Sequence, residues 1–230
     1  MNRLLSHLRD DPLRARVVPF VLFVVLTFAQ GWGPPAAAFW LYALKTLLGA
    51  LLLVAVWPVV TEMRWHFSLA GLLTGVAVFA VWVGLDPLCE ALGWAGSYPK
   101  WKLGEPWNPH AVFGRDSALA WFFIGVRVLG STLVVPPLEE AFYRSFLYRY
   151  AEKADFLAVP LRGLLGRPFL ITTVLFGLAH REWLAALICG AAYQGLVCWK
   201  GRLGDAMTAH AVTNLLLGLW VAGRGQWQYW

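Results

Sequence analysis

Long apolar runs separated by short polar segments make up most of the chain. The first three extend from about Val17 to Trp32, Ala38 to Val60 and Phe67 to Leu85, and each has roughly the length of a bilayer-crossing helix. The later apolar segments cover residues 117–135, 138–150, 168–180, 184–199 and 205–222. The pattern predicts an all-α polytopic membrane protein, a bundle of about eight transmembrane or membrane-embedded helices forming a single domain over residues 1–230.

Composition and charge support a bilayer as the surroundings. The 230 residues are 59% hydrophobic and 14% charged, whereas a soluble domain has roughly 25% charged residues. The net charge of +6 does not indicate nucleic-acid binding, because the basic residues lie mainly in the N-terminal tail and the loops rather than on one stripe. The arginines at positions 3, 9, 14 and 16 predict a cytoplasmic N-terminus by the positive-inside rule.

Three features of the middle of the chain predict departures from simple spans. The polar stretch from Asp86 to Asp116 is interpreted as a connector outside the cytoplasm rather than a lid. Lys45, inside an apolar run, is expected to reach the nearer interface. Pro136 and Pro137 are expected to break or kink the helix begun at 117 near residue 135, so that a second helix opens at the glutamates and its N-terminal dipole stabilises their charge.

Five polar side chains in apolar segments supply candidate chemistry. They are two adjacent glutamates, two histidines and an asparagine: Glu139, Glu140, His180, His210 and Asn214. Ionisable groups inside a membrane cost about 2.5 to 3.5 kcal/mol each and usually have a function, although a histidine taken alone is more often a hydrogen-bonded core residue. The set predicts a centre for acid–base chemistry.

The spacing assigns different roles to these residues. Glu140 and Arg144 lie four residues apart on a helix and can pair, so Arg144 is expected to be supporting rather than catalytic. Glu139 is rotated by about 100° from Glu140 and is the candidate reactive carboxylate. His210 and Asn214 also share one helical face, which suits two donors that stabilise an oxyanion.

These segments carry a family resemblance. The motifs Glu139-Glu140-x-x-x-Arg144, Phe176-x-x-x-His180 and His210-x-x-x-Asn214 resemble those of the CAAX prenyl protease and bacteriocin-processing (CPBP, or Abi) family of intramembrane proteases. The resemblance covers roughly residues 117–222, and the surrounding sequence is further similar to the bacterial CAAX protease-related branch found with exosortase systems. Residues 1–116 match only as generic spans.

The resemblance implies an intramembrane endopeptidase with a water-filled catalytic cavity. Glu139 and His180 would activate water, His210 and Asn214 would stabilise the oxyanion, and Glu140 with Arg144 would support the site. A membrane-tethered protein or peptide is the expected substrate, and a bacterial inner (plasma) membrane is the expected location. Strict alternation of spans, however, places His180 toward the opposite face from Glu139.

Two alternatives stay open. No cofactor is expected, but a glutamate and two histidines can also form a three-ligand zinc site with an open water position, which would make the chain a metalloprotease. The same Glu and His residues can instead serve as the relay of a proton-coupled transporter, although no repeated half is visible in the sequence.

Overall fold

The computed structural model describes residues 2–94 and 106–230, and within these ranges every regular element is a helix. The α-helices are α1 (Asn2–Arg9), α2 (Pro12–Ala29), α3 (Pro35–Val56), α4 (Leu69–Ala91), α5 (Pro109–Phe113), α6 (Ala118–Leu129), α7 (Val135–Glu140), α8 (Tyr148–Glu152), α9 (Gly166–Leu178), α10 (Trp183–Lys200) and α11 (Leu203–Arg224). Five helices of the described residues are long and apolar enough to cross a membrane. The predicted class, an all-α polytopic membrane protein, is confirmed.

The helices divide between two compact units. The first unit comprises Met1–Met63, Gly104–Phe142 and Asn214–Trp230, and the second comprises Arg64–Leu103 and Tyr143–Thr213. Two of the four boundaries fall within helices, one inside α11 and one inside the helical run from Ala118 to Glu152. The single-domain organisation stays a prediction, and each unit is described by itself.

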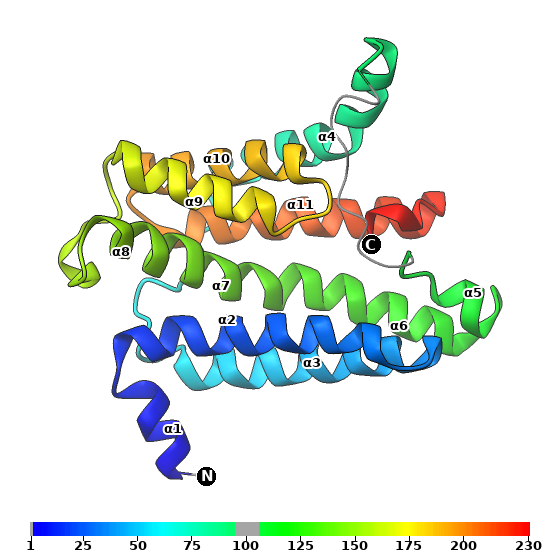
Figure 1. The fold of residues 1–230 in the computed structure, drawn as a ribbon, viewed down its shortest axis with the longest axis horizontal. Helices are drawn as coiled ribbons and strands as arrows, with labels where there is room; N and C mark the ends of the chain where they lie inside the picture. Colours follow the sequence, from blue (N-terminus) through cyan, green and yellow to red (C-terminus); the bar gives the residue numbers. More distant parts are fainter. Residues whose placement is uncertain (1, 95–105) are drawn as a thin grey trace. The chain divides into compact units, whose positions relative to one another are not determined.

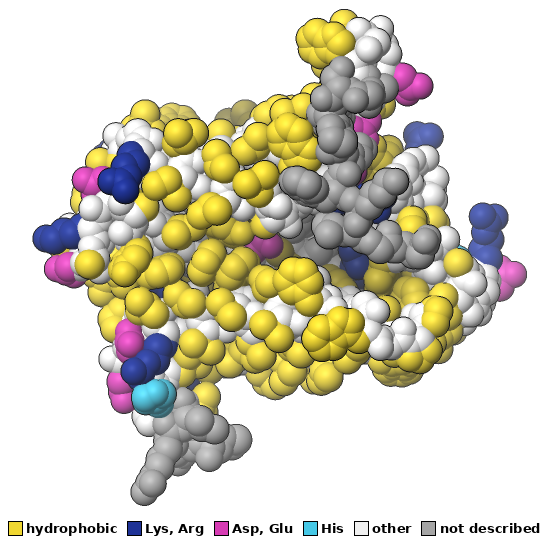
Figure 2. Space-filling model, in the orientation of Figure 1, with side chains coloured by type: hydrophobic (Ala, Val, Ile, Leu, Met, Phe, Trp, Pro, Cys, Tyr) yellow, Lys and Arg dark blue, Asp and Glu magenta, His cyan; other side chains and the backbone are white. Residues whose placement is uncertain are grey.

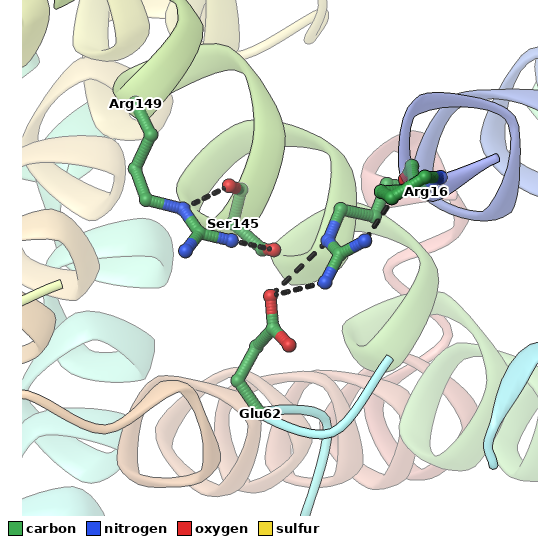
Figure 3. A network of polar contacts seen from close by, with 5 residues as sticks. Arg16, Glu62, Ser145 and Arg149 are labelled. Atoms are coloured by element: carbon green, nitrogen blue, oxygen red, sulfur yellow. Dashed lines mark hydrogen bonds and ion pairs between the residues drawn. The ribbon is translucent and has the colours of Figure 1, made fainter. Parts of the chain in front are cut away.

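In the first unit, α2 and α3 form a helical hairpin closed by a short 3-10 turn, η1 (Gln30–Trp32) (Figure 1). The Asp11 carboxylate caps α2 by accepting the Leu13 N–H at 2.8 Å. At the open end of the hairpin, Arg16 donates two hydrogen bonds to one oxygen of Glu62, at 2.7 and 3.1 Å (Figure 3). This part-buried ion pair holds the start of α2 to the segment that follows α3.

The outer faces of these helices are apolar. On α3, Leu47, Leu51 and Val54 are exposed at helical spacing, and Figure 2 shows apolar side chains over most of one face, with charged side chains mainly near helix ends and connections. A lipid-facing surface has this composition. Lys45 does not reach the interface as expected: it is buried, and its ammonium donates to Thr27 Oγ1 at 2.8 Å because α2 supplies an acceptor inside the unit.

The helical run from Ala118 to Glu152 does not break at its prolines. A π turn, η2 (Gly130–Val134), precedes Pro136, and a second, η3 (Ala141–Leu147), follows α7. Of the predicted break or kink, the break was wrong, because the wider π turn carries the backbone past two residues that lack an N–H. Glu139 and Glu140 therefore lie in the last turn of α7, and the expected stabilisation by a helix N-terminus is absent there.

In the second unit, α9 and α10 pack side by side, and α10 also contacts α4 (Figure 1). Asp205, fully buried in the first turn of α11, accepts hydrogen bonds from Ser68, the N-cap of α4, and from Arg202 Nε at 2.9 Å. Helix α4 continues to Ala91, so the connector begins later than the predicted Asp86 because Pro87 is tolerated inside the helix. The middle of that predicted connector lies outside the described residues.

Candidate active site

Glu139 and Glu140 occupy the end of α7 in the first unit. Glu140 is fully buried, and Glu139 is half-buried. The Glu139 Oε2 atom is inaccessible and has no hydrogen-bond partner among the described residues. The ammonium of Lys45 interacts attractively with the Glu139 carboxylate. A buried carboxylate oxygen without a donor is a position where a water molecule or a reacting group can bind.

Asn214 belongs to the same unit, and Pro136 explains how it is held. Its Nδ2 donates to the carbonyl oxygen of Ser131 at 2.7 Å. The N–H of Val135 bonds to the carbonyl of Gly130 instead, and the next residue, Pro136, has no N–H. The Ser131 carbonyl thus lacks its usual helical donors, and the Asn214 carboxamide replaces them. This contact orients the nitrogen of Asn214 toward the π turn.

His180 lies just beyond the C-terminus of α9 in the second unit. Its Nδ1 is 2.7 Å from the carbonyl oxygen of Phe176. A carbonyl can only accept, so Nδ1 carries the proton, and in the neutral imidazole Nε2 holds the lone pair. This tautomer has the basic nitrogen that proton abstraction from water needs. The Trp82 ring packs edge-on against the imidazole, with centroids 5.8 Å apart.

The Phe176 ring is the contact shared by three polar side chains of this unit. Its centroid lies 4.6 Å from that of His180 and 6.2 Å from that of His210. The Arg144 guanidinium lies 4.4 Å from the same centroid, is fully buried, and donates to the Gly190 carbonyl at 3.3 Å. The Phe-x-x-x-His motif therefore combines a ring that packs the site and a carbonyl that fixes the tautomer.

Tyr193 and Thr213, which were not among the predicted site residues, support His210. The Tyr193 ring stacks on the buried imidazole, with centroids 5.1 Å apart and planes inclined by 28°. The Tyr193 hydroxyl donates to Thr213 Oγ1 at 2.7 Å, and Thr213 Oγ1 lies 2.9 Å from the Gly75 carbonyl of α4. The sequence signal for Tyr193 was a tyrosine inside the apolar run 184–199, because the hydroxyl of a tyrosine that becomes buried needs a hydrogen-bond partner.

The candidate residues divide between the units. Glu139, Glu140 and Asn214 belong to the first unit, whereas His180, His210 and Arg144 belong to the second. The convergence of all four candidate catalytic residues, and the pairing of Glu140 with Arg144, stay predictions. Within the described residues, no group of three or more His, Cys, Asp or Glu side chains is arranged to hold a metal ion. The choice between a metal-free and a zinc mechanism is not tested by this finding.

A comparison with protein families identifies the segment that carries these residues. Residues 118–216 match the family model described as type II CAAX prenyl endopeptidase Rce1-like. No curated protein and no solved structure matches the chain. The match favours a peptidase over a transporter, and the association with exosortase systems stays a prediction. Through this segment, the chain is similar to the type II CAAX prenyl endopeptidases, which are proteases.

Proposed function

We propose that the chain hydrolyses a peptide bond of a membrane-tethered protein or peptide by a metal-free mechanism. Glu139 and His180 activate the attacking water, and His210 and Asn214 stabilise the oxyanion. The observation that carries the proposal is the Glu139 Oε2 atom, which is buried without a donor among the described residues in the segment that matches the family. A water molecule that donates a hydrogen bond to this oxygen would satisfy the carboxylate, and the carboxylate would hold the water in position for attack.

The tautomer of His180 supports a division of the base role. With Nδ1–H directed to the Phe176 carbonyl, Nε2 is the atom that accepts a proton. The water proton passes to Glu139 or to Nε2 as the water oxygen bonds to the substrate carbonyl carbon. The same proton then goes to the leaving nitrogen as the C–N bond breaks. General bases of this kind contribute about 10²- to 10⁴-fold to the rate.

The oxyanion donors are supported by the contacts that hold them. One N–H of the Asn214 carboxamide is used by the Ser131 carbonyl, which leaves the second N–H of the same nitrogen for the oxyanion. His210 is stacked on Tyr193, so its ring orientation is set before substrate binds. Preorganised donors are effective because they need no rearrangement as charge develops.

We further propose a bacterial inner-membrane location with the N-terminus in the cytoplasm. The Arg16–Glu62 ion pair supports this topology, because it holds the start of α2 and the segment after α3 at one end of the same hairpin. Both segments are polar, and the basic residues of the N-terminal tail lie at that end. The substrate is expected to reach the site from the bilayer.

The test is cleavage of a pooled library of membrane peptides by the purified full chain in detergent. Glu139→Gln keeps the size of the side chain and removes the base, and Glu152→Gln, at an exposed position, is its matched control. His210→Ala has His66→Ala, also exposed, as its control. We expect losses of about 10²- to 10⁴-fold in the two site variants and near-normal rates in the controls.

A strong chelator separates the two mechanisms. Wild-type cleavage that survives chelation supports the metal-free mechanism, whereas cleavage that is lost and is restored by zinc assigns a metalloprotease. Full activity in folded Glu139→Gln protein would exclude the proposed base. The proton-coupled transporter becomes the better description if no variant and no wild-type preparation cleaves while liposomes containing the wild type conduct protons.

A further inference from the structure

The Arg127 guanidinium, in α6 of the first unit, is surrounded by aromatic rings. Its Cζ atom lies 4.6 Å from the ring centroid of Trp107, 4.9 Å from that of Tyr42 and 5.1 Å from that of Trp230. These rings come from the segment before α5, from α3 and from the C-terminal residue. Ring faces attract the cation through their quadrupoles, but they accept few hydrogen bonds.

The charged edge of this guanidinium has no acceptor among the described residues, since Arg127 makes no hydrogen bond or ion pair there. Arginine has five N–H donors in a planar fork, so a half-buried guanidinium can bind an oxyanion through several donors at once. A second donor beside it is also unsatisfied: Trp107 is 8% exposed, and its indole Nε1 atom is buried with no partner in the described chain. Two adjacent donors thus lack an acceptor within residues 2–94 and 106–230.

The positive charges around Arg127 also favour an anionic ligand. The Lys45 ammonium lies 4.6 Å from the Tyr42 centroid, so one ring contacts two cations. Arg127 and Lys45 repel each other, and Glu139 is the carboxylate that attracts Lys45. Among the described residues, Arg127 has no carboxylate partner. An oxyanion is the ligand that would satisfy both the charge and the donors, and guanidinium binds phosphate and carboxylate oxygens through two parallel hydrogen bonds.

We propose that Arg127 and Trp107 bind the phosphate group of an anionic membrane phospholipid. The surrounding wall is rich in indole rings: His110 contacts both Trp121 and Trp227, with centroids 5.1 and 5.4 Å apart, and Trp107 contacts Trp230 at 5.7 Å. Indole rings of this density are typical of the lipid headgroup region. Trp121 itself is exposed on α6, where a lipid would approach.

The experiment measures lipid binding by native mass spectrometry of the full chain in detergent. Phosphatidylglycerol is titrated in parallel with phosphatidylcholine, oleate and inorganic phosphate. We expect saturable binding of phosphatidylglycerol by the wild type, with weaker binding of the other three. Arg127→Gln should weaken it about tenfold or more, as expected for loss of a hydrogen bond to a charged group, and Trp107→Phe, which keeps a ring and removes the N–H, should weaken it several-fold. Arg115→Gln, at an exposed position, should have no effect.

Several outcomes would overturn the proposal. Equal binding of phosphatidylglycerol by wild type and by Arg127→Gln protein excludes this guanidinium as the site. Equal or tighter binding of inorganic phosphate assigns a soluble anion, and tighter binding of oleate assigns a carboxylate. Trp107→Phe keeps the test decisive if Arg127→Gln fails to fold, because its binding must fall while its melting temperature without lipid stays near that of the wild type.

Discussion

The hydrogen bond from Asn214 to the Ser131 carbonyl predicts a specific coupling between two distant positions. In the wild type, Pro136 denies the carbonyl a helical donor, and the carboxamide supplies one at 2.7 Å. Asn214→Ala should therefore leave a carbonyl unsatisfied. Pro136→Ala restores a backbone N–H one π turn beyond Ser131, so the carbonyl should depend less on the side chain in that background.

The magnitude follows from the cost of an unsatisfied buried acceptor, about 1 to 3 kcal/mol. We expect Asn214→Ala to lower the free energy of unfolding by about that amount in the wild type, and by about 1 kcal/mol less when Pro136→Ala is also present. For a chain of this size, each kcal/mol corresponds to roughly 2 to 4 °C in melting temperature. Couplings between residues that share a partner fall within about 0.5 to 3 kcal/mol.

The assay is a double-mutant cycle measured by unfolding of the purified proteins in mixed micelles. Ser131→Ala is the control, since it removes a hydroxyl that bonds to Val128 and leaves the Ser131 carbonyl in place. Additivity of the two substitutions within about 0.5 kcal/mol would refute the reasoning. Peptide cleavage provides a second readout: the double variant should recover stability without recovering activity, because Pro136→Ala supplies no donor to the proposed oxyanion.

Three further predictions concern packing and charge. Gly75→Ala should destabilise the chain by about 1 to 3 kcal/mol, because a Cβ there would lie 2.5 Å from a carbonyl oxygen of α11. Gly84→Ala is the control and should be tolerated, because a Cβ there would meet no described atom within 4 Å; thermal unfolding distinguishes the two variants. Phe176→Leu should reduce peptide cleavage more than stability, because the ring packs both imidazoles; comparing cleavage rate with melting temperature checks this. Arg16→Met should cost up to about 3 to 5 kcal/mol, and a second change, Glu62→Met, should recover part of it in unfolding experiments.

The helices could be predicted from the sequence because apolar runs of sufficient length have few other stable forms in a bilayer. The runs at 184–199 and 205–222 correspond closely to α10 and α11. The path through Pro136 could not be predicted in the same way. Its missing N–H is compensated by a π turn and by Asn214, which bonds to the Ser131 carbonyl from 83 residues later in the chain, and a local sequence pattern does not reveal a partner at that distance.

In the candidate site too, the sequence could suggest individual residues but not the contacts that they make with other helices. Ionisable groups in apolar segments made Glu139, His180 and His210 candidates from the sequence alone, because burying such groups in a membrane is costly wherever they lie, and their roles stay predictions. The Lys45 side chain points into the unit because Thr27, on another helix, accepts a hydrogen bond from it, and no local sequence pattern predicts this contact. Tyr193 is similar: a tyrosine in an apolar run signals a need for a partner, but its contact with His210, on another helix, is not visible in the local sequence.

The spacing within each motif has a structural reason. Glu139 and Arg144 lie on either side of the unit boundary that follows Phe142, and His210 and Asn214 lie on either side of the one that follows Thr213. In each case continuous helical backbone joins the two members, through a π turn in the first and through α11 in the second. A helix fixes the separation and rotation of residues about one turn apart. Geometry within a motif is therefore local, whereas the proposed chemistry needs residues of different motifs to meet, and it is most sensitive to the contacts between helices that position them.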